Sequence, residues 1–472
     1  MIKYKQHKNN KEGRYENLNK NFKNIALIST LITSMLTLSA CSNKESEKAE
    51  IEEVKTNVIS TEELQKNLKK DDWVVVDTRL SDSYNGWVLN GEKRGGHIPE
   101  AVDFSYNWLG VENKNKEKIL KEALKTKGIE KDKNIVLYDT DGKASNEVAN
   151  YLNEQGYKNL YTYDIDEWAN DKKLPLKKYE NYEMIVPSKV VKDVVDGKTP
   201  ETFEDAKDIK IVEASWGEET ESYAKGHIPT SVHINTDTVE PPPTWMLGSD
   251  EDLTKFANDY GFTKDDTIIV TGAEPMAAYR VSAVLRYMGV NDVRVLNGGT
   301  DSWVSAGYEL ETESNKKTPG TDFKATIPAN PDLVVTIPEL KEKLKDDKFT
   351  LVDNRMWDEY IGKISGYSYH DKKGRIPGAV YGYAGTEGST SLNYYRNIDK
   401  TMRNANEIEA LWKDSGIDTN NHLAFMCGSG WRAAEVLTYS NVMGHKNTSL
   451  YSDGWIGWSN DTRNPTETGE PK

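Results

Sequence analysis

Cys427 is the residue whose setting points most directly to chemistry. It follows the apolar run 423–426 and opens the glycine-rich segment Cys-Gly-Ser-Gly-Trp-Arg, which leads into the helical pattern 433–437. In such a loop, backbone N–H groups and the positive end of a helix dipole can converge on the sulfur atom. These surroundings stabilise a thiolate, the nucleophilic form of cysteine, so we expect Cys427 to be a catalytic nucleophile.

The five residues after this cysteine supply the groups that such a nucleophile needs. Gly428 and Gly430 permit tight curvature, and the loop amides can stabilise a thiolate. Ser429 can donate its hydroxyl, Trp431 can form a wall of the site or simply pack, and Arg432 can bind an anion. A solvated arginine is disfavoured there, because the helix dipole opposes a cation in the first turn. A buried structural cysteine is the alternative, but the glycines, the serine and the arginine favour a reactive one.

These residues belong to the last of three copies of one unit. Each copy begins with a short apolar strand that ends in an acid and continues through a turn of the type Gly-His-Ile-Pro. A second apolar strand follows, then a loop, a helix that ends at a glycine, and a further strand with an aromatic turn. The first strands are 74–79, 211–215 and 351–355, the second strands are 135–138, 267–270 and 423–426, and the glycines are Gly156, Gly289 and Gly444.

Short apolar strands without alternation, separated by helices, predict an α/β fold with a mainly parallel sheet flanked by helices in each copy. We place three tandem domains at residues 57–182, 183–316 and 330–466, each near the usual domain size. Ligands of such sheets bind at the carboxyl ends of the strands, and Cys427 follows one of those ends.

The other cysteine, Cys41, belongs to an export signal. Residues 1–23 are polar and basic, and the apolar stretch from Ile25 to Leu38 suits a signal-peptide core better than a membrane-spanning helix. The Leu-Ser-Ala-Cys run that ends at Cys41 resembles a bacterial lipobox, in which the cysteine is lipidated. An ordinary cleavage site or an uncleaved anchor is the alternative.

We therefore expect a lipoprotein signal peptide at 1–40 and a soluble, flexible tether at 41–56. The protein would then be held by lipid at the extracytoplasmic side of the cell membrane, and nothing else in the sequence would touch that membrane.

The acidic composition opposes nucleic acid as a partner. The net charge is −15, and residues 1–40 carry seven Lys or Arg and two Asp or Glu, so the mature chain stands at −15 − 5 = −20. Nucleic-acid binding needs a basic footprint. No zinc spacing, phosphate loop or dinucleotide fingerprint occurs, so we expect no metal and no cofactor. His97 and His227 are expected to be hydrogen-bonded turn residues rather than metal ligands.

The repeated pattern resembles the rhodanese family of sulfurtransferases. The residues that carry the likeness are the acid-ended strand, the Gly-His-Ile-Pro turn, the loop before an Ala-rich helix, and the run 295–299 with Trp303. Three tandem copies with the cysteine in the last are similar to exported three-domain thiosulfate sulfurtransferase-like proteins of bacteria. The resemblance implies that Cys427 takes sulfur from an anionic donor as a persulfide and passes it to a thiophilic acceptor such as cyanide or a thiol.

The resemblance also implies finer features. Four residues separate Cys427 from Arg432, one fewer than in rhodanese-like phosphatases, which favours sulfur over phosphate. The exported three-domain likeness favours thiosulfate as the donor, while the loop begins like those of mercaptopyruvate enzymes, so 3-mercaptopyruvate stays open. Arg396 lies in a connection where the family often places substrate-binding side chains.

The first two copies lack a thiol at the matching position, where they have Asp139 and Thr271. We expect both copies to be non-catalytic and either to shape the cleft of the third copy or to bind a partner. The rival hypothesis from another functional class is a non-enzymatic lipoprotein that binds a sulfur compound or senses redox state through Cys427.

Overall fold

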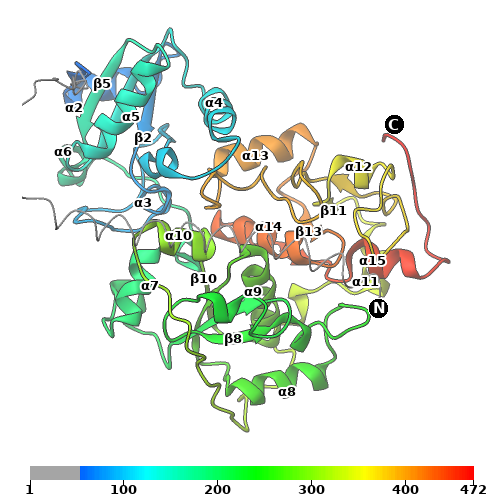
Figure 1. Ribbon diagram of the computed structural model, residues 1–472. Coiled ribbons are helices and arrows are strands. Elements are labelled where there is room, and N and C mark those ends of the chain that lie inside the picture. The colour runs from blue at the N-terminus through cyan, green and yellow to red at the C-terminus, as the bar shows by residue number, and fades with distance from the viewer. Residues whose placement is uncertain (1–53, 472) are drawn as a thin grey trace, which may run out of the picture. The chain divides into compact units, whose positions relative to one another are not determined.

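A computed structural model describes residues 54–471, which form three successive α/β repeats (Figure 1). Each repeat has its own sheet, and the paired strands within the three sheets are parallel. The predicted fold class is therefore confirmed. The expected signal peptide, Cys41 and most of the tether lie outside the described residues. Within 54–471, no helix combines the length and the apolar character that crossing a bilayer requires.

The first repeat has a five-stranded sheet in the order β1-β5-β4-β2-β3. Its strands are β1 (Asn57–Val58), β2 (Trp73–Asp77), β3 (Val102–Asp103), β4 (Asn134–Asp139) and β5 (Leu160–Asp164). Its α-helices are α2 (Thr61–Asn67), α3 (Ser81–Asn85), α4 (Lys116–Thr126), α5 (Lys143–Glu154) and α6 (Ile165–Asn170). Because β2 and β4 run parallel, Asp77 and Asp139 both lie at the carboxyl edge of the sheet.

The second repeat has the equivalent order β6-β10-β9-β7-β8. Its strands are β6 (Ile185–Val186), β7 (Lys210–Ser215), β8 (Val232–Asn235), β9 (Thr267–Thr271) and β10 (Asp292–Leu296). Its α-helices are α7 (Ser188–Val195), α8 (Asp250–Tyr260), α9 (Pro275–Met288) and α10 (Gly299–Ser305).

The third repeat keeps four strands in the order β12-β11-β13-β14, and a single bridge from Val334 to Leu450 extends its edge. Its strands are β11 (Phe349–Asp353), β12 (Val380–Tyr381), β13 (His422–Met426) and β14 (Thr448–Leu450). Its α-helices are α11 (Ile337–Lys343), α12 (Trp357–Tyr360), α13 (Ala405–Asp414), α14 (Trp431–Val442) and α15 (Gly454–Asn460). Short 3-10 helices lie at Tyr106–Gly110, Tyr182–Met184, Glu201–Phe203, Tyr223–Lys225, Thr236–Thr238 and Pro331–Leu333.

Local sequence sets where several helices begin and end. Helix α8 begins with a capping box, in which Ser249 and Asp252 each accept a hydrogen bond from the other's backbone N–H. Gly156, Gly289 and Gly444 follow α5, α9 and α14 with φ angles of 89°, 111° and 101°, so the predicted left-handed helix ends are confirmed.

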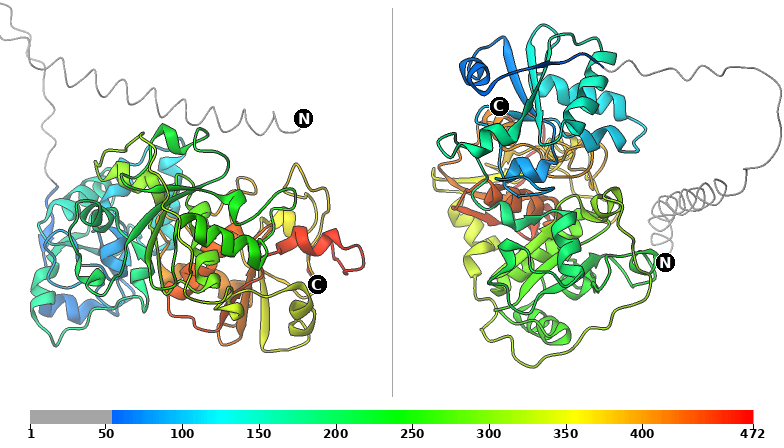
Figure 2. Two further views of the ribbon diagram at one scale, coloured as in Figure 1. Left: turned by 90° about the horizontal axis from the view of Figure 1, so that it is seen from below. Right: turned by 90° about the vertical axis from the view of Figure 1, so that its left-hand side faces the viewer.

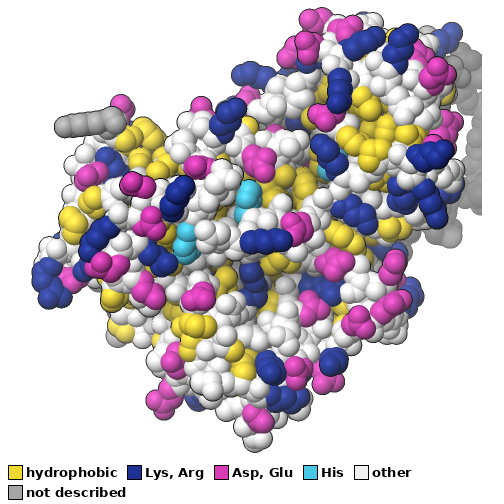
Figure 3. Space-filling view, turned by 180° about the vertical axis from the view of Figure 1, so that it is seen from behind, with side chains coloured by type: hydrophobic (Ala, Val, Ile, Leu, Met, Phe, Trp, Pro, Cys, Tyr) yellow, Lys and Arg dark blue, Asp and Glu magenta, His cyan; other side chains and the backbone are white. Residues whose placement is uncertain are grey.

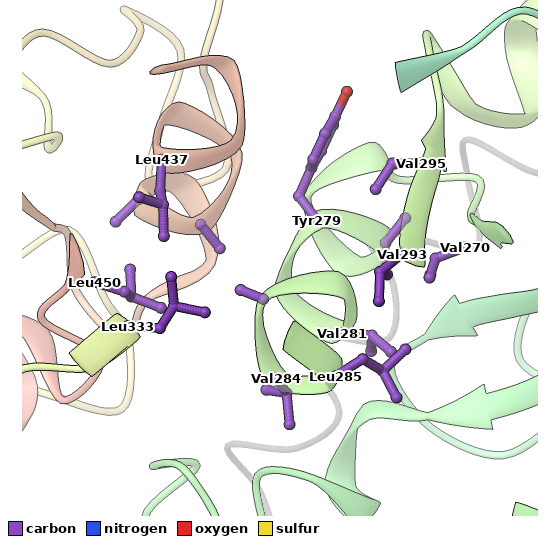
Figure 4. Packing of buried hydrophobic residues seen from close by; sticks show 14 of the residues in the cluster. Val270, Tyr279, Val281, Val284, Leu285, Val293, Val295, Leu333, Leu437 and Leu450 are labelled. Atoms are coloured by element: carbon purple, nitrogen blue, oxygen red, sulfur yellow. The ribbon is translucent and has the colours of Figure 1, made fainter. Parts of the chain in front are cut away.

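Helices α9 and α14 pack against each other and join the second and third repeats (Figure 1). In Figure 4, Leu437 of α14 lies above Leu450 and Leu333. Val281 and Leu285 of α9 lie toward the strand residue Val293 of the second repeat. One continuous group of buried apolar side chains thus spans both repeats. Apolar burial on this scale holds the second repeat firmly against the helix that follows Cys427.

The segment 395–407 of the third repeat contacts the other two repeats. Asn404 Nδ2 donates to Tyr84 Oη at 2.8 Å in the first repeat, and Met402 N donates to Asn297 Oδ1 at 3.0 Å in the second. Figure 2 shows the yellow-to-red third repeat beside both the blue-to-cyan and the green repeats. Acidic and basic side chains are intermixed over the face seen in Figure 3.

Candidate active site

Cys427 lies between the end of β13 and the start of α14, at the carboxyl edge of the third sheet. Its side chain is 2 % exposed and its sulfur is free of any disulfide. It is the one cysteine within residues 54–471. The strand and helix patterns of the sequence placed it in this loop, and the structure has the same arrangement.

The first two carbonyls of the loop point toward the start of α15. The carbonyls of Cys427 and Gly428 accept hydrogen bonds from Trp455 N and Ile456 N, at 2.8 and 3.0 Å, at the start of α15. In a trans peptide the N–H points opposite to the C=O, so the amides of Gly428 and Ser429 point away from α15. The loop then enters α14 through Gly430, whose φ of 92° is left-handed.

The first repeat shows what a loop of this shape binds. Asp139 occupies the place of the cysteine, and its carboxylate accepts hydrogen bonds from Gly142 N at 2.9 Å and from Ser145 N and Oγ at 3.1 Å. Gly142 caps α5 with φ 78° and ψ −6°, close to the 92° and −13° of Gly430. By register, Gly430 N and Ala433 N are the equivalent donors in the third repeat.

A carboxylate oxygen of aspartate stands two bonds from Cβ, as does the outer sulfur of a cysteine persulfide. The Asp139 carboxylate thus occupies the position where that outer sulfur would lie in the third repeat. In the first repeat, the carboxylate itself is the anion that the loop amides bind. Preorganised amides at such a position stabilise negative charge without further rearrangement.

Arg432 is buried and bound by other protein groups. Its guanidinium is 1 % exposed and makes two bonds to Glu359, Nη1 to Oε2 at 2.8 Å and Nη2 to Oε1 at 3.1 Å. Nη2 also donates to Tyr367 Oη at 2.7 Å. Burial raises the pKa of Glu359, but the charge and hydrogen bonds of Arg432, together with the charge of Arg355 and a hydrogen bond from Met356 N, lower it overall. A role for Arg432 in binding a donor stays a prediction, and its observed partners are α12 and the segment that carries Tyr367.

Aromatic side chains lie over the loop. A side chain on Gly428 would overlap the Tyr367 hydroxyl, so this ring lies directly on the loop backbone. Tyr369 follows at 5.6 Å from Tyr367, and Trp245 of the second repeat lies 5.6 Å from Tyr369, both measured between ring centroids. Burial, with further contributions from the charges of Cys427 and Glu240, raises the pKa of Tyr369 to about 12, while a hydrogen bond with Ser429 lowers it. The hydroxyl of Tyr369 is therefore protonated at neutral pH and can act as a hydrogen-bond donor.

Trp431 reaches from the loop to the second repeat. Its Nε1 donates to Glu240 Oε2 at 2.6 Å, and Glu240 Oε1 accepts from Arg280 Nε at 2.5 Å. Glu240 and Arg280 are both 1 % exposed. The second repeat thus contributes charged groups to the surroundings of the loop.

Arg396 lies in the contact between the second and third repeats. Its guanidinium bonds Glu435 of α14 through Nε and Nη2, both at 2.6 Å, and Glu274 of the second repeat at 3.1 Å. None of these bonds involves the cysteine loop, so a substrate-binding role for Arg396 stays a prediction.

The remaining candidates have structural partners. His97 Nδ1 lies 2.8 Å from Tyr84 O and His227 Nδ1 lies 2.9 Å from Tyr223 O, which confirms that both are hydrogen-bonded turn residues. Among residues 54–471, no group of His, Cys, Asp and Glu side chains is arranged to hold a metal ion.

Several residues around Cys427 escaped sequence reasoning. They are Glu240, Trp245 and Arg280 of the second repeat and Glu359, Tyr367 and Tyr369 of the third. Two signals could have found part of this set: Glu240 directly precedes three prolines, and Arg280 is a charged residue in the middle of a mainly apolar helix. The others come from segments far from the loop in sequence, and only the fold brings them together.

Three segments of the chain match the rhodanese-like domain family, at residues 60–171, 199–306 and 336–461. The thiosulfate sulfurtransferase YnjE of Escherichia coli K12 is 37 % identical over 406 residues, which cover 85 % of this chain and 91 % of that protein. The sulfur carrier protein TtuD of Thermus thermophilus is 27 % identical over 282 residues, which cover 57 % of this chain and 94 % of that protein.

Solved structures of EanB are similar along most of the chain. The wild-type EanB structure has a TM-score of 0.83 and 34 % identity, and the match covers 88 % of this chain and 99 % of that one. The anaerobic ergothioneine biosynthesis enzyme from Chlorobium limicola, in complex with its natural substrate trimethyl histidine, has the same TM-score and identity, covering 88 % and 100 %. With three matching segments and this arrangement of strand, cysteine loop and helix, the chain belongs to the rhodanese-like family of sulfurtransferases.

Proposed function

We propose that this protein transfers a sulfane sulfur from thiosulfate to a thiophilic acceptor through a persulfide on Cys427. The Cys427 thiolate attacks the outer sulfur of thiosulfate, an S–S bond forms to the cysteine, and the S–S bond of the donor breaks to release sulfite. An acceptor such as cyanide or a thiol then takes the outer sulfur and restores the thiolate. Charge is conserved in both steps.

The observation that carries this proposal is the carboxylate of Asp139 in the matching loop of the first repeat. It shows that a loop of this shape directs amides at an anion two bonds from Cβ. A persulfide on Cys427 would place its negative outer sulfur at the same point. Similarity to the E. coli thiosulfate sulfurtransferase supports thiosulfate as the donor, and 3-mercaptopyruvate remains the alternative donor.

A second candidate concerns the acceptor. The rings of Tyr369 and Trp245, with the Glu240 carboxylate close by, form surroundings that favour an organic cation. The similar enzyme from C. limicola is described with trimethyl histidine, a quaternary ammonium compound. A trimethylammonium compound with an imidazole ring is therefore the acceptor we propose as the alternative to cyanide or a simple thiol.

Mass spectrometry of the purified protein tests the proposal. After incubation with thiosulfate, the peptide that contains Cys427 is expected to gain the mass of one sulfur atom, and cyanide or trimethyl histidine is expected to remove it. Cys427→Ser should abolish both the gain and the turnover. A wild-type peptide that never gains sulfur from thiosulfate or mercaptopyruvate would favour the non-enzymatic binding or redox-sensing lipoprotein instead.

We also propose that the protein works at the extracytoplasmic side of the cell membrane, held there by a lipid on Cys41. The basic start, the short apolar stretch and the small residues before Cys41 support this location.

A further inference from the structure

Arg280 and Glu240 form a buried ion pair whose atoms face the cysteine loop from the second repeat. Nε of Arg280 lies 2.5 Å from Glu240 Oε1, and the two side chains are 1 % and 2 % exposed. Removing two charges from water costs free energy that their mutual attraction offsets only in part, so stability alone does not explain a pair at this position.

Arg280 and Glu240 donate or accept hydrogen bonds at two places around the cysteine loop. Arg280 Nη2 donates to Ser452 Oγ at 2.8 Å, in the turn before α15, whose amides bind the carbonyls of the loop. A Cβ on Gly430 would lie 2.9 Å from Arg280 Nη1, so the guanidinium lies against the loop backbone itself. Glu240 Oε2 accepts from Trp431 Nε1 at 2.6 Å, at the first residue of α14.

We propose that the Arg280–Glu240 pair is a positioning device by which the second repeat, itself without a thiol, orients the Cys427 loop and balances its charge. The inference rests on the proposed function only in treating Cys427 as the nucleophile. The second repeat would then take part in the reaction although it has Thr271 where the third repeat has its cysteine.

Arg280 and Glu240 carry opposite charges, so neutralising one or the other is expected to have opposite effects on the stability of the Cys427 thiolate. With Glu240 neutral, the Arg280 charge is uncompensated beside Gly430 and stabilises the Cys427 thiolate. With Arg280 neutral, Glu240 and the nearby Asp453, whose pKa burial raises and Arg280 lowers, oppose the thiolate instead. Cys427 also interacts electrostatically with Arg432, Tyr367 and Tyr369, and Arg432 is in turn paired with Glu359. These four groups are the same in every variant below.

The test is the pH dependence of alkylation of Cys427 by iodoacetamide, followed by mass spectrometry of its peptide in the full chain. Glu240→Gln is expected to move the midpoint of the rate profile down by about 0.5–1 pH unit, and Arg280→Met to move it up by a similar amount. The double variant Glu240→Gln with Arg280→Met should return near the wild-type midpoint. Arg294→Met, which breaks an ion pair with Asp292 elsewhere in the second repeat, is the matched control and should leave the midpoint unchanged.

Shifts of the same sign in both single variants, or shifts no larger than that of Arg294→Met, would overturn the inference. Should Arg280→Met fail to fold, Trp431→Phe decides the positioning part. That variant removes the bond to Glu240 without a change of charge. The plateau rate of Cys427 alkylation is therefore expected to change severalfold at an unchanged midpoint, and an unchanged plateau rate would contradict the inference. Alkylation needs no sulfur donor, so these outcomes stand apart from a wild-type protein that fails to take up sulfur.

Discussion

Gly428, next to the nucleophile, has no side chain because Tyr367 occupies the space that one would need. Its backbone is not in the left-handed region, so the requirement for glycine is one of room rather than of φ. The same Tyr367 hydroxyl accepts from Arg432. Tyr367 therefore contacts both Gly428 and Arg432, and a shift of its ring would affect both.

We expect Gly428→Ala to lower kcat/KM by at least about tenfold, or about 1.4 kcal/mol of transition-state stabilisation. The added methyl group must displace Tyr367, which breaks its bond to Arg432 and shifts the loop amides. Steady-state kinetics with thiosulfate and cyanide measure the loss. Gly110→Ala is the control, because a Cβ there meets no atom within 4 Å. Wild-type activity in Gly428→Ala would mean that Tyr367 moves freely.

The partner of Arg432 could not be predicted from the residues next to it in the sequence. An arginine in the first turn of a helix beside a reactive cysteine suggests a free cation for an anionic donor. The structure instead gives it Glu359, 73 positions earlier in the chain, as a bidentate partner. Cys427 itself was predictable because its loop, strand and helix are contiguous, whereas the partner of Arg432 depends on how α12 folds back over the loop.

At the scale of single elements, the three first strands β2, β7 and β11 differ in one pairing. Two of them end in an aspartate paired with the arginine two residues later, Asp77 with Arg79 at 2.6 Å and Asp353 with Arg355 at 2.7 Å. In the second repeat the acid is Glu213 and the arginine is replaced by Ser215. Strand β7 thus carries the buried carboxyl of Glu213 near its end without a cation beside it, and one oxygen of that carboxyl has no hydrogen-bond partner.

This carboxyl makes stability depend on pH. Burial raises the pKa of Glu213 to about 7 in the folded chain, against about 4.3 for an unfolded one. Between these values the folded state binds more protons, so the contribution of Glu213 to the free energy of unfolding falls as pH rises and is lowest above about pH 7. We expect Glu213→Gln to raise Tm at about pH 8 and to change it little at about pH 4.5, as calorimetry at both values would show.

The matched control for this prediction is Glu204→Gln, an exposed carboxylate of the same repeat. Its Tm should follow the wild type at both pH values. A Glu213→Gln variant that is less stable than the wild type at the higher pH would mean that the ionised carboxylate has a partner in solution.

At the scale of the whole molecule, the repeated pattern of the sequence predicts three parallel sheets, because each sheet is made from contiguous strands and helices. It does not predict how the repeats meet. Helices α9 and α14 are buried along nearly their whole length, whereas the matching α5 keeps a polar side, but this difference does not say which helix packs on which. The polar segment 395–407 has the composition of an ordinary connection, although it contacts both other repeats. The side chains around Cys427 come from the second and third repeats. Their arrangement is therefore visible only in the folded chain.

The start of the chain carries the last prediction, which concerns where the molecule resides. If Cys41 is lipidated, metabolic labelling with a fatty-acid analogue should mark the wild-type protein and leave Cys41→Ser unmarked. The variant should then move from the membrane fraction to the soluble fraction, or accumulate with its signal peptide attached, because no helix in residues 54–471 is long and apolar enough to cross a bilayer. Thiol chemistry at Cys427 provides the control, since the purified variant should still form the persulfide at the wild-type rate. A wild-type chain that is released without lipid would show that the run before Cys41 is an ordinary cleavage site, and the third repeat would then meet its donor in free solution rather than at a membrane surface.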